Sequence, residues 1–283
     1  LRNAIKQSCD TYFYETARKL GVDRLSITAS KFGLGGKVLK EYFPNEKKGL
    51  VPNTKWKKDT LGIGWVLGET LITGIGQGYI QTTPLQLCLM MAQLANGGFK
   101  IYPKIVVDEN QDTLENIKYK MALNANKEKE ANILPKIRAV EELFNIKNEK
   151  YTQLFRNPEN VKFVLEAVFA STNELYGTSY SSRIEDPKYQ FAGKTGTSQV
   201  KKITEEAREL DLKISQIPYE ERDHALYIAY GPYKNPRYAV SIIVEHGGSG
   251  SAVAAPIVKK LFKFIIDRHE LREQTRKQNL VTT

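Results

Sequence analysis

The chain has 283 residues, of which 41% are hydrophobic and 26% charged, with a formal net charge of +10. This mixture is too apolar for an intrinsically disordered protein and supplies a core for one large domain or two small ones. No uninterrupted apolar stretch reaches the roughly 18 residues of a membrane span. The positive charge suits an anionic partner, but no zinc-finger spacing or aromatic-studded basic strand is present, so we expect no nucleic-acid partner.

The cysteines and histidines do not form a metal-binding pattern. Cys9 and Cys88 are the only cysteines and form no C-x-x-C pair, and the three histidines are scattered. His269 is followed by Glu273 where a zinc-protease helix needs a second histidine. We therefore expect no metal site.

Helical spacing dominates the first hundred residues. Apolar residues at 13, 17 and 20, followed by Gly21, predict a helix over residues 11–20 with Asp10 as its N-cap. The ten glycines between 33 and 78 predict a long ordered-loop region with short helices, lying over a surface or lining a cleft. Thr83 and Pro84 then open a helix that runs through Leu94 and stops at the glycines 97 and 98.

The middle of the chain is divided between a polar segment and helices. Residues 108–135 are rich in Lys and Asn and predict an exposed excursion. Helical patterns return over 136–147 and 158–172. The expected apolar face of the second helix is formed by Phe163, Val164, Ala167, Val168 and Ser171.

The last hundred residues change to strand patterns and end in a helix. Strands are predicted over 189–198, 225–230 and 238–244, with the charged residues 200–222 as a second exposed excursion. A final amphipathic helix is predicted over 252–266, and the polar residues 267–283 are predicted to form a frayed tail. The apolar side of this helix is expected to carry Ile257, Leu261, Phe264 and Ile265. This order favours an α+β fold with an antiparallel sheet.

The run Gly193–Thr197 is the first candidate site. A phosphate-binding loop would need glycine at 188, where Lys188 stands. In a strand, glycine lets an extended peptide lie alongside, and the lysine and threonines can then hold a terminal carboxylate. The alternative is an exposed edge strand whose lysine and threonines serve only solubility.

The run Ser8-Cys9-Asp10 is the second candidate, and by itself it could be only a turn serine and a helix cap. In this order, the two runs resemble two of the three signatures of penicillin-interacting serine enzymes: S-x-x-K, S-x-N and K-T-G. Four segments are similar to the elongation branch of the class B penicillin-binding proteins: Ser8–Tyr14, Gly74–Tyr79, Thr82–Gln86 and Ala192–Val200. The similarity covers most of residues 1–265 and is weak over 108–160 and 200–222.

The sequence departs from that family in two places. Asp10 stands where the family has asparagine, and an ionised aspartate cannot donate a hydrogen bond but can offset the charge of a nearby lysine. The nucleophile motif is expected upstream of Leu1, so residues 1–266 read as the C-terminal portion of a transpeptidase domain. The only S-x-x-K here is Ser198–Lys201, whose ends would face opposite sides of a strand, which makes Ser198 a poor nucleophile.

The resemblance implies a penicillin-binding, serine β-lactamase-like fold with an antiparallel sheet flanked by helices, a helical subdomain and an N-terminal part outside this chain. It implies that a serine attacks the carbonyl between two D-alanines of a peptidoglycan stem peptide, and that an amine of a neighbouring stem takes the acyl group. It assigns Ser8 to proton relay, Asp10 to orienting that network and Lys194 to supplying positive potential.

The resemblance also assigns substrate binding to Thr195, Gly196 and Thr197, with the Thr197 backbone N–H in the oxyanion hole. It implies no metal or organic cofactor, and β-lactams as ligands. It further suggests an MreC-type scaffold and a membrane glycosyltransferase as partners. The expected location is the bacterial inner membrane, held by an N-terminal anchor outside this chain, with this region in the periplasm.

Two other readings stay open at this point. One is a non-catalytic penicillin-binding sensor that uses the cleft for recognition only. The other is a D,D-carboxypeptidase or β-lactamase, since hydrolysis and transfer differ only in which nucleophile reaches the acyl-enzyme. This chain alone is expected to be inactive in either enzymatic reading.

Overall fold

The computed structural model describes residues 1–105, 152–200 and 214–281. The predicted excursion at 108–135, the predicted helix at 136–147 and residues 201–213 of the second excursion lie outside these ranges. In the described part of 200–222, short 3-10 turns form at Ile214–Gln216 and Tyr219–Glu221. No described helix is both long and apolar enough to cross a bilayer.

The three predicted strands form one antiparallel sheet. Strands β1 (Ala192–Ser198), β2 (His224–Gly231) and β3 (Tyr238–Val244) follow one another in the order β1-β2-β3. Lys194 lies opposite Ile228 in β2, so the K-T-G run is part of a paired strand. Among the described strands β1 is at an edge, which leaves its other side without a neighbouring strand.

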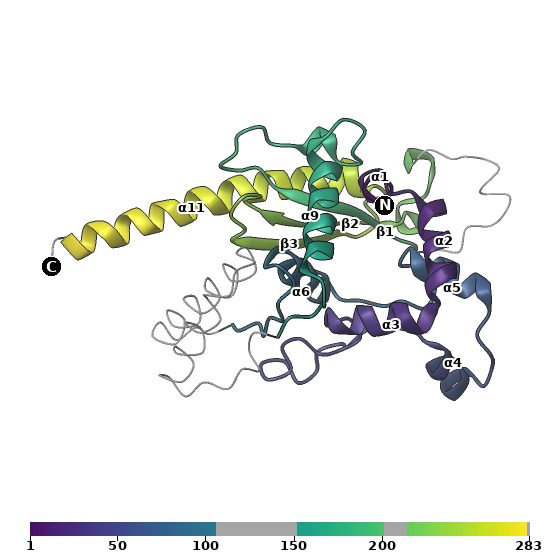
Figure 1. Ribbon diagram of the computed structural model, residues 1–283. Coiled ribbons are helices and arrows are strands. Elements are labelled where there is room, and N and C mark those ends of the chain that lie inside the picture. The colour runs from purple at the N-terminus through teal and green to yellow at the C-terminus, as the bar shows by residue number, and fades with distance from the viewer. Residues whose placement is uncertain (106–151, 201–213, 282–283) are drawn as a thin grey trace, which may run out of the picture.

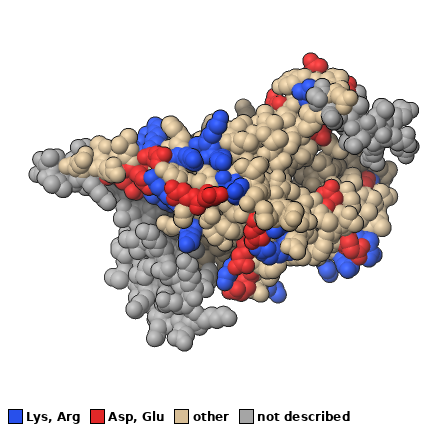
Figure 2. Space-filling view, turned by 90° about the horizontal axis from the view of Figure 1, so that it is seen from above, with Lys and Arg blue, Asp and Glu red and all other residues tan. Residues whose placement is uncertain are grey.

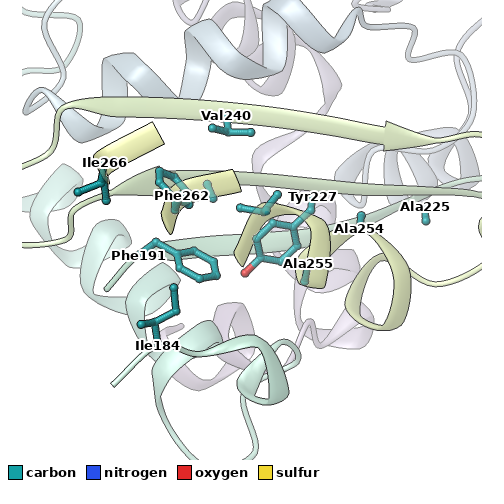
Figure 3. Packing of buried hydrophobic residues seen from close by; sticks show 11 residues of the cluster. Ile184, Phe191, Ala225, Tyr227, Val240, Ala254, Ala255, Phe262 and Ile266 are labelled. Atoms are coloured by element: carbon teal, nitrogen blue, oxygen red, sulfur yellow. The ribbon is translucent and has the colours of Figure 1, made fainter. Parts of the chain in front are cut away.

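One face of the sheet carries the main apolar core. Helix α11 (Ala255–Val281), preceded by a π-helical turn at Gly250–Ala254, packs there, and Phe262 stacks on Phe191 with ring centroids 5.2 Å apart. Figure 3 shows these rings beside Tyr227. The buried side of the helix advances in steps of four residues, through Ala254, Val258, Phe262 and Ile266.

Two sequence predictions for this helix are wrong. Ile257 and Phe264 were expected on the buried side, but they are 43% and 60% exposed. Both sides of the helix carry apolar residues, so the pattern could not decide which one meets the sheet. The helix also continues to Val281, where a frayed tail was expected. Figure 2 shows Lys and Arg interspersed with Asp and Glu where α11 projects, in line with ion pairs from Lys188 to Asp267 and Glu270.

Two helices cover the opposite face of the sheet (Figure 1). Helix α6 (Pro84–Ala95) begins with a capping box between Thr83 and Gln86, and α9 (Pro158–Asn173) is capped by Asn157. Met91 and Val168 from these helices pack with Ala192 and Tyr230 of the sheet. Both helices confirm the predicted segments. Of the predicted apolar face of α9, Phe163 is 39% exposed, so its inclusion was wrong.

Short helices gather at the end of the molecule that carries the N-terminus (Figure 1). They are α1 (Arg2–Lys6), α2 (Asp10–Leu20), α3 (Val22–Lys31), α4 (Thr54–Leu61) and α5 (Leu67–Gly74). Gly74 lies against α2 so closely that an added Cβ would be 2.4 Å from Cβ of Ala17. Cys9 is the N-cap of α2 and Asp10 is its first residue, so the prediction of Asp10 as the cap was wrong by one position.

A buried ion pair holds α4 to α5. Lys57 is 3% exposed, and its ammonium contacts Glu69, which also accepts a hydrogen bond from the Val66 N–H at 3.0 Å. The ammonium lies 5.8 Å from the ring centroid of Trp65 and 6.0 Å from that of Tyr79. A charge this deeply buried is tolerated because the carboxylate and the ring faces compensate its lost hydration. The pair fixes the start of the segment that leads into the Gly74–Gly78 loop.

Candidate active site

The fold brings together the two runs that the sequence singled out. Ser8 lies in the turn between α1 and α2, with a left-handed φ of 52° that is uncommon for a residue other than glycine. The Nζ atom of Lys194, 186 residues away in sequence, donates a hydrogen bond to the Ser8 hydroxyl. The same Nζ donates to the carbonyl of Thr195 at 3.0 Å. Ser8 and Lys194 therefore form one hydrogen-bonded pair at the edge of the sheet.

The environment of Lys194 makes its ammonium titratable near neutral pH. Burial lowers the Lys194 pKa to about 8, because a buried ammonium loses its hydration. The charge of Asp10 acts in the opposite direction and favours the ammonium. Within the described ranges Asp10 forms no ion pair with Lys194. The expected charge offset by Asp10 therefore acts through space.

A hydroxyl group from the loop after α9 reaches the side chain of Thr195. The Thr195 hydroxyl donates to Oγ1 of Thr178 at 3.4 Å, and Thr178 Oγ1 lies 3.0 Å from Oγ of Ser171. The Thr178 N–H also donates to the carbonyl of Lys6, just before Ser8. The sequence reasoning missed Thr178 and treated Ser171 only as part of a packed face. No spacing signal could have found this contact, because it depends on how the loop after α9 returns to the sheet.

The start of β1 is fixed by a second group of buried hydroxyls. The Gly193 N–H donates to Oγ1 of Thr172 at 3.0 Å, and the same hydroxyl lies 2.9 Å from the Tyr227 hydroxyl. Ser179 Oγ lies 2.8 Å from that phenol oxygen. Burial raises the Tyr227 pKa to about 12, so the phenol stays protonated and neutral. A Cβ at Gly193 would be 2.4 Å from the Tyr227 ring, which explains the glycine.

The glycine-rich segment 74–78 reaches the other end of the K-T-G run. The Gln77 side chain donates from Nε2 to the carbonyl of Thr197 at 2.8 Å. This region was predicted to lie over a surface or to line a cleft, and its contact is with an exposed residue of β1. Thr197 itself is exposed, and within the described residues its hydroxyl has no hydrogen-bond partner.

The backbone of β1 points alternately toward β2 and away from it, as in any antiparallel strand. Residues 193, 195 and 197 point outward, because their backbone groups bond to Thr172, Lys194 and Gln77 and not to β2. In the parts of the chain that the structure covers, the outward N–H groups of Thr195 and Thr197 have no partner. This open stretch can accept an extended peptide as an added strand.

The remaining candidates in β1 are Ser198 and Gly196. Ser198 ends β1, and Lys201, the other end of its S-x-x-K run, falls outside the described residues. Gly196 lies between the two threonines, where a Cβ would meet only the Leu226 side chain at 3.4 Å. Residues 1–105, 152–200 and 214–281 contain no group of three or more His, Cys, Asp or Glu that could bind a metal ion.

The structure has an antiparallel sheet between helices, with a hydrogen-bonded Ser–Lys pair beside an open K-T-G strand. This combination is typical of the penicillin-interacting serine enzymes. Residues 1–263 match the family model described as the penicillin binding protein transpeptidase domain. The chain belongs to that family.

Among curated proteins, the chain is 32% identical over 269 residues to peptidoglycan D,D-transpeptidase MrdA of Salmonella typhimurium. That match covers 93% of this chain and 37% of the relative, so the chain spans little more than a third of the length of that protein.

Solved structures with the same architecture include two penicillin-binding proteins named PBP2. PBP2 of Pseudomonas aeruginosa, in complex with WCK 5153, is 35% identical with a TM-score of 0.66, over 91% of this chain and 47% of that one. PBP2 of Helicobacter pylori, in complex with MreC, is 27% identical with a TM-score of 0.68, over 94% of this chain and 40% of that one. The penicillin-binding fold predicted from the sequence is thereby confirmed.

Proposed function

We propose that the protein containing this chain is a serine-type peptidoglycan D,D-transpeptidase that cross-links stem peptides during cell elongation and is a target of β-lactams. The observation that carries the proposal is the hydrogen bond between Lys194 and Ser8 beside the open backbone of Thr195 and Thr197. Family membership and the activity in the printed name of the MrdA relative support it.

In the proposed reaction the donor stem binds as a strand added to the outer edge of β1. A serine outside residues 1–283 attacks the carbonyl carbon of the penultimate D-alanine, and its proton passes to a neighbouring lysine. The oxyanion is held by the Thr197 N–H, which points to this edge. The C–N bond then breaks, and the terminal D-alanine leaves as an amine after taking a proton. An amine of a second stem displaces the serine from the acyl-enzyme and completes the cross-link.

During these reaction steps, residues of this chain relay a proton and supply charge. Ser8 relays a proton to the leaving amine, because its hydroxyl both accepts from Lys194 and keeps a proton to donate. Asp10 orients that network and favours the charged form of Lys194. The ammonium and the Thr195 and Thr197 hydroxyls bind the terminal carboxylate, and Gly196 permits the close approach of the donor backbone.

The proposed setting is the periplasmic side of a bacterial inner membrane, with an anchor outside this chain. A scaffold of the MreC type is proposed as a partner, because PBP2 of Helicobacter pylori forms a complex with MreC. A membrane glycosyltransferase that makes the glycan strand is proposed as a second partner, since cross-linking requires newly polymerised glycan. A role in cell shape follows from cross-linking during elongation.

Acylation by a penicillin tests the proposal. The full-length protein and the 283-residue chain are incubated with benzylpenicillin, and intact masses and peptide maps are recorded. We expect one stable adduct on a serine outside residues 1–283, and none on the chain alone. No adduct on the full-length protein would favour a non-catalytic sensor. An adduct that hydrolyses within seconds would favour a β-lactamase, and release of D-alanine without cross-linking would favour a carboxypeptidase.

A further inference from the structure

The carbonyl of Thr197 is already occupied by a side chain of this protein. Gln77 donates to it from Nε2 at 2.8 Å, across 120 residues of sequence. The bond joins the loop after α5 to the exposed end of β1. Within the described residues the other polar atom of this side chain, Oε1, accepts no hydrogen bond, so the contact with Thr197 is its single described anchor.

A peptide added to this edge needs the same carbonyl. In an antiparallel ladder, opposed residues that bond to each other exchange both N–H···O bonds, so the incoming residue opposite Thr197 uses its N–H and its C=O. The Thr197 N–H is free for the incoming carbonyl, but the Thr197 carbonyl is not free for the incoming N–H. The amide of Gln77 therefore takes the place of the donor peptide amide. Binding of the donor has to displace it.

We propose that Gln77 is a displaceable gate that competes for the Thr197 carbonyl with acyl donors carrying an amide N–H beside the reactive carbonyl. The inference rests on the proposed function, since it assumes that the outer edge of β1 receives the donor. A donor with this N–H replaces the Gln77 bond to Thr197 with its own, and then gains the full two-bond pairing. An acylating agent without the N–H does not compete for the Thr197 carbonyl, so the Gln77 bond stays in place while the agent reacts.

The loop around Gln77 allows the side chain to leave while the backbone stays in place. The Gln77 N–H donates to the carbonyl of Ile72 at 3.0 Å, and the flanking Gly76 and Gly78 have φ values of 80° and 78°. A Cβ at Gly78 would meet Ile72 at 2.9 Å, so this side of the loop is packed, whereas a Cβ at Gly76 would meet nothing within 4 Å. The side chain of Gln77 is partly exposed, so it can rotate into solvent.

Two classes of β-lactam distinguish a displaceable gate from a structural strut, which is a side chain that only holds the loop in place. Penicillins carry an acylamino group whose N–H lies beside the reactive carbonyl, whereas carbapenems carry a hydroxyethyl group at that position. We expect Gln77→Met, which keeps the length of the side chain and removes its donor, to accelerate acylation by benzylpenicillin by about two- to tenfold, the range that one net hydrogen bond sets. Acylation by a carbapenem should change by a smaller factor, because no amide competes for the Thr197 carbonyl.

The experiment measures second-order acylation constants of the full-length protein with benzylpenicillin and with meropenem, for the wild type, Gln77→Met and Gln81→Met. Gln81 is exposed and bonds to Leu50 only through its backbone, so its substitution should leave both constants unchanged. An equal fall with both β-lactams in Gln77→Met would make Gln77 a strut and overturn the gate. Equal constants in all three proteins would overturn it as well. A wild type that neither compound acylates would overturn the proposed function together with the gate.

Discussion

The two ends of β1 have different surroundings. Ala192 and Gly193 are buried, and both backbone groups of Gly193 are paired with the Thr172 hydroxyl. Thr195 and Thr197, a few residues on, keep free outward N–H groups in the described structure, and Thr197 is exposed. Partners on α9 and β2 therefore hold the start of β1 in place. The outward N–H groups near its end stay able to bind a peptide.

This division has a physical use. A reacting strand has to be held within a fraction of an ångström, but the groups that bind the substrate must stay unpaired until it arrives. Buried hydroxyls hold Gly193 because each donor and acceptor there is satisfied inside the fold. Lys194 lies at the boundary, with its backbone in the paired strand and its ammonium on Ser8. We expect substitutions at the two ends to affect different observables.

The largest effect is expected from Lys194→Met in the full-length protein. Removal of the ammonium that supports the Ser8 relay and binds the carboxylate should lower the second-order constant of penicillin acylation by about 10²- to 10⁴-fold. The unfolding temperature should not fall at pH 7, because the substitution removes a buried charge that costs hydration. Ser198→Ala is the control and should leave acylation unchanged. A large loss in Ser198→Ala would move the nucleophile into β1 and refute the assignment.

The pH dependence of stability tests the environment of Lys194 directly. Its pKa is about 8 in the folded protein and 10.5 ordinarily, so between these values the unfolded chain binds more protons than the folded one. Stability contributed by this residue therefore rises with pH from 8 to 10.5 and is flat below 8. The unfolding temperature of the wild type, measured relative to Lys194→Met, should rise across this window. A constant difference would show that Lys194 is not desolvated.

A smaller effect is expected from alanine at the two glycines of the run. Gly193→Ala should destabilise the full-length protein by about 1–3 kcal/mol, because its Cβ would overlap the Tyr227 ring. Gly196→Ala should stay within about 0.5 kcal/mol, since its Cβ meets Leu226 at an ordinary 3.4 Å. Urea unfolding midpoints measure both. Equal destabilisation at the two sites would contradict the distinction between a fixed and an open end.

Much of this arrangement could be predicted from the sequence, because the signals for it are local. Strand patterns, the cap at Thr83 and the glycine stop at Gly21 each depend on neighbouring residues, and the structure has them where they were predicted. The proximity of Ser8 to Lys194 came from family resemblance and not from spacing. The bond from Gln77 to Thr197 and the hydroxyls around Thr172 join segments far apart in sequence. Such contacts depend on tertiary packing, which periodicity does not encode.

The buried side of α11 shows a different limit. Apolar residues occupy two adjacent stripes of this helix, one through Val258 and Phe262 and the other through Ile257 and Phe264. Periodicity identifies a stripe but cannot rank two of similar hydrophobicity. The ranking comes from shape, because Phe262 fits against Phe191 and the small residues 254 and 255 let the helix approach β2 closely.

A smaller effect than that of Gly193→Ala is expected from Tyr227→Phe, which removes one hydroxyl from the fixed end. Thr172 and Ser179 lose their contact with the phenol, but Thr172 keeps Gly193 and Ser179 keeps the carbonyl of Ser171. The full-length protein should therefore lose about 0.5–1.5 kcal/mol of stability, the net value of one hydrogen bond. Acylation by benzylpenicillin well below the unfolding temperature should stay within twofold of the wild type. Tyr176→Phe is the control, because this side chain is 84% exposed. A fall in acylation without a fall in stability would mean that the buried hydroxyls tune the reacting strand as well as anchor it, and the two ends of β1 would then act as one unit.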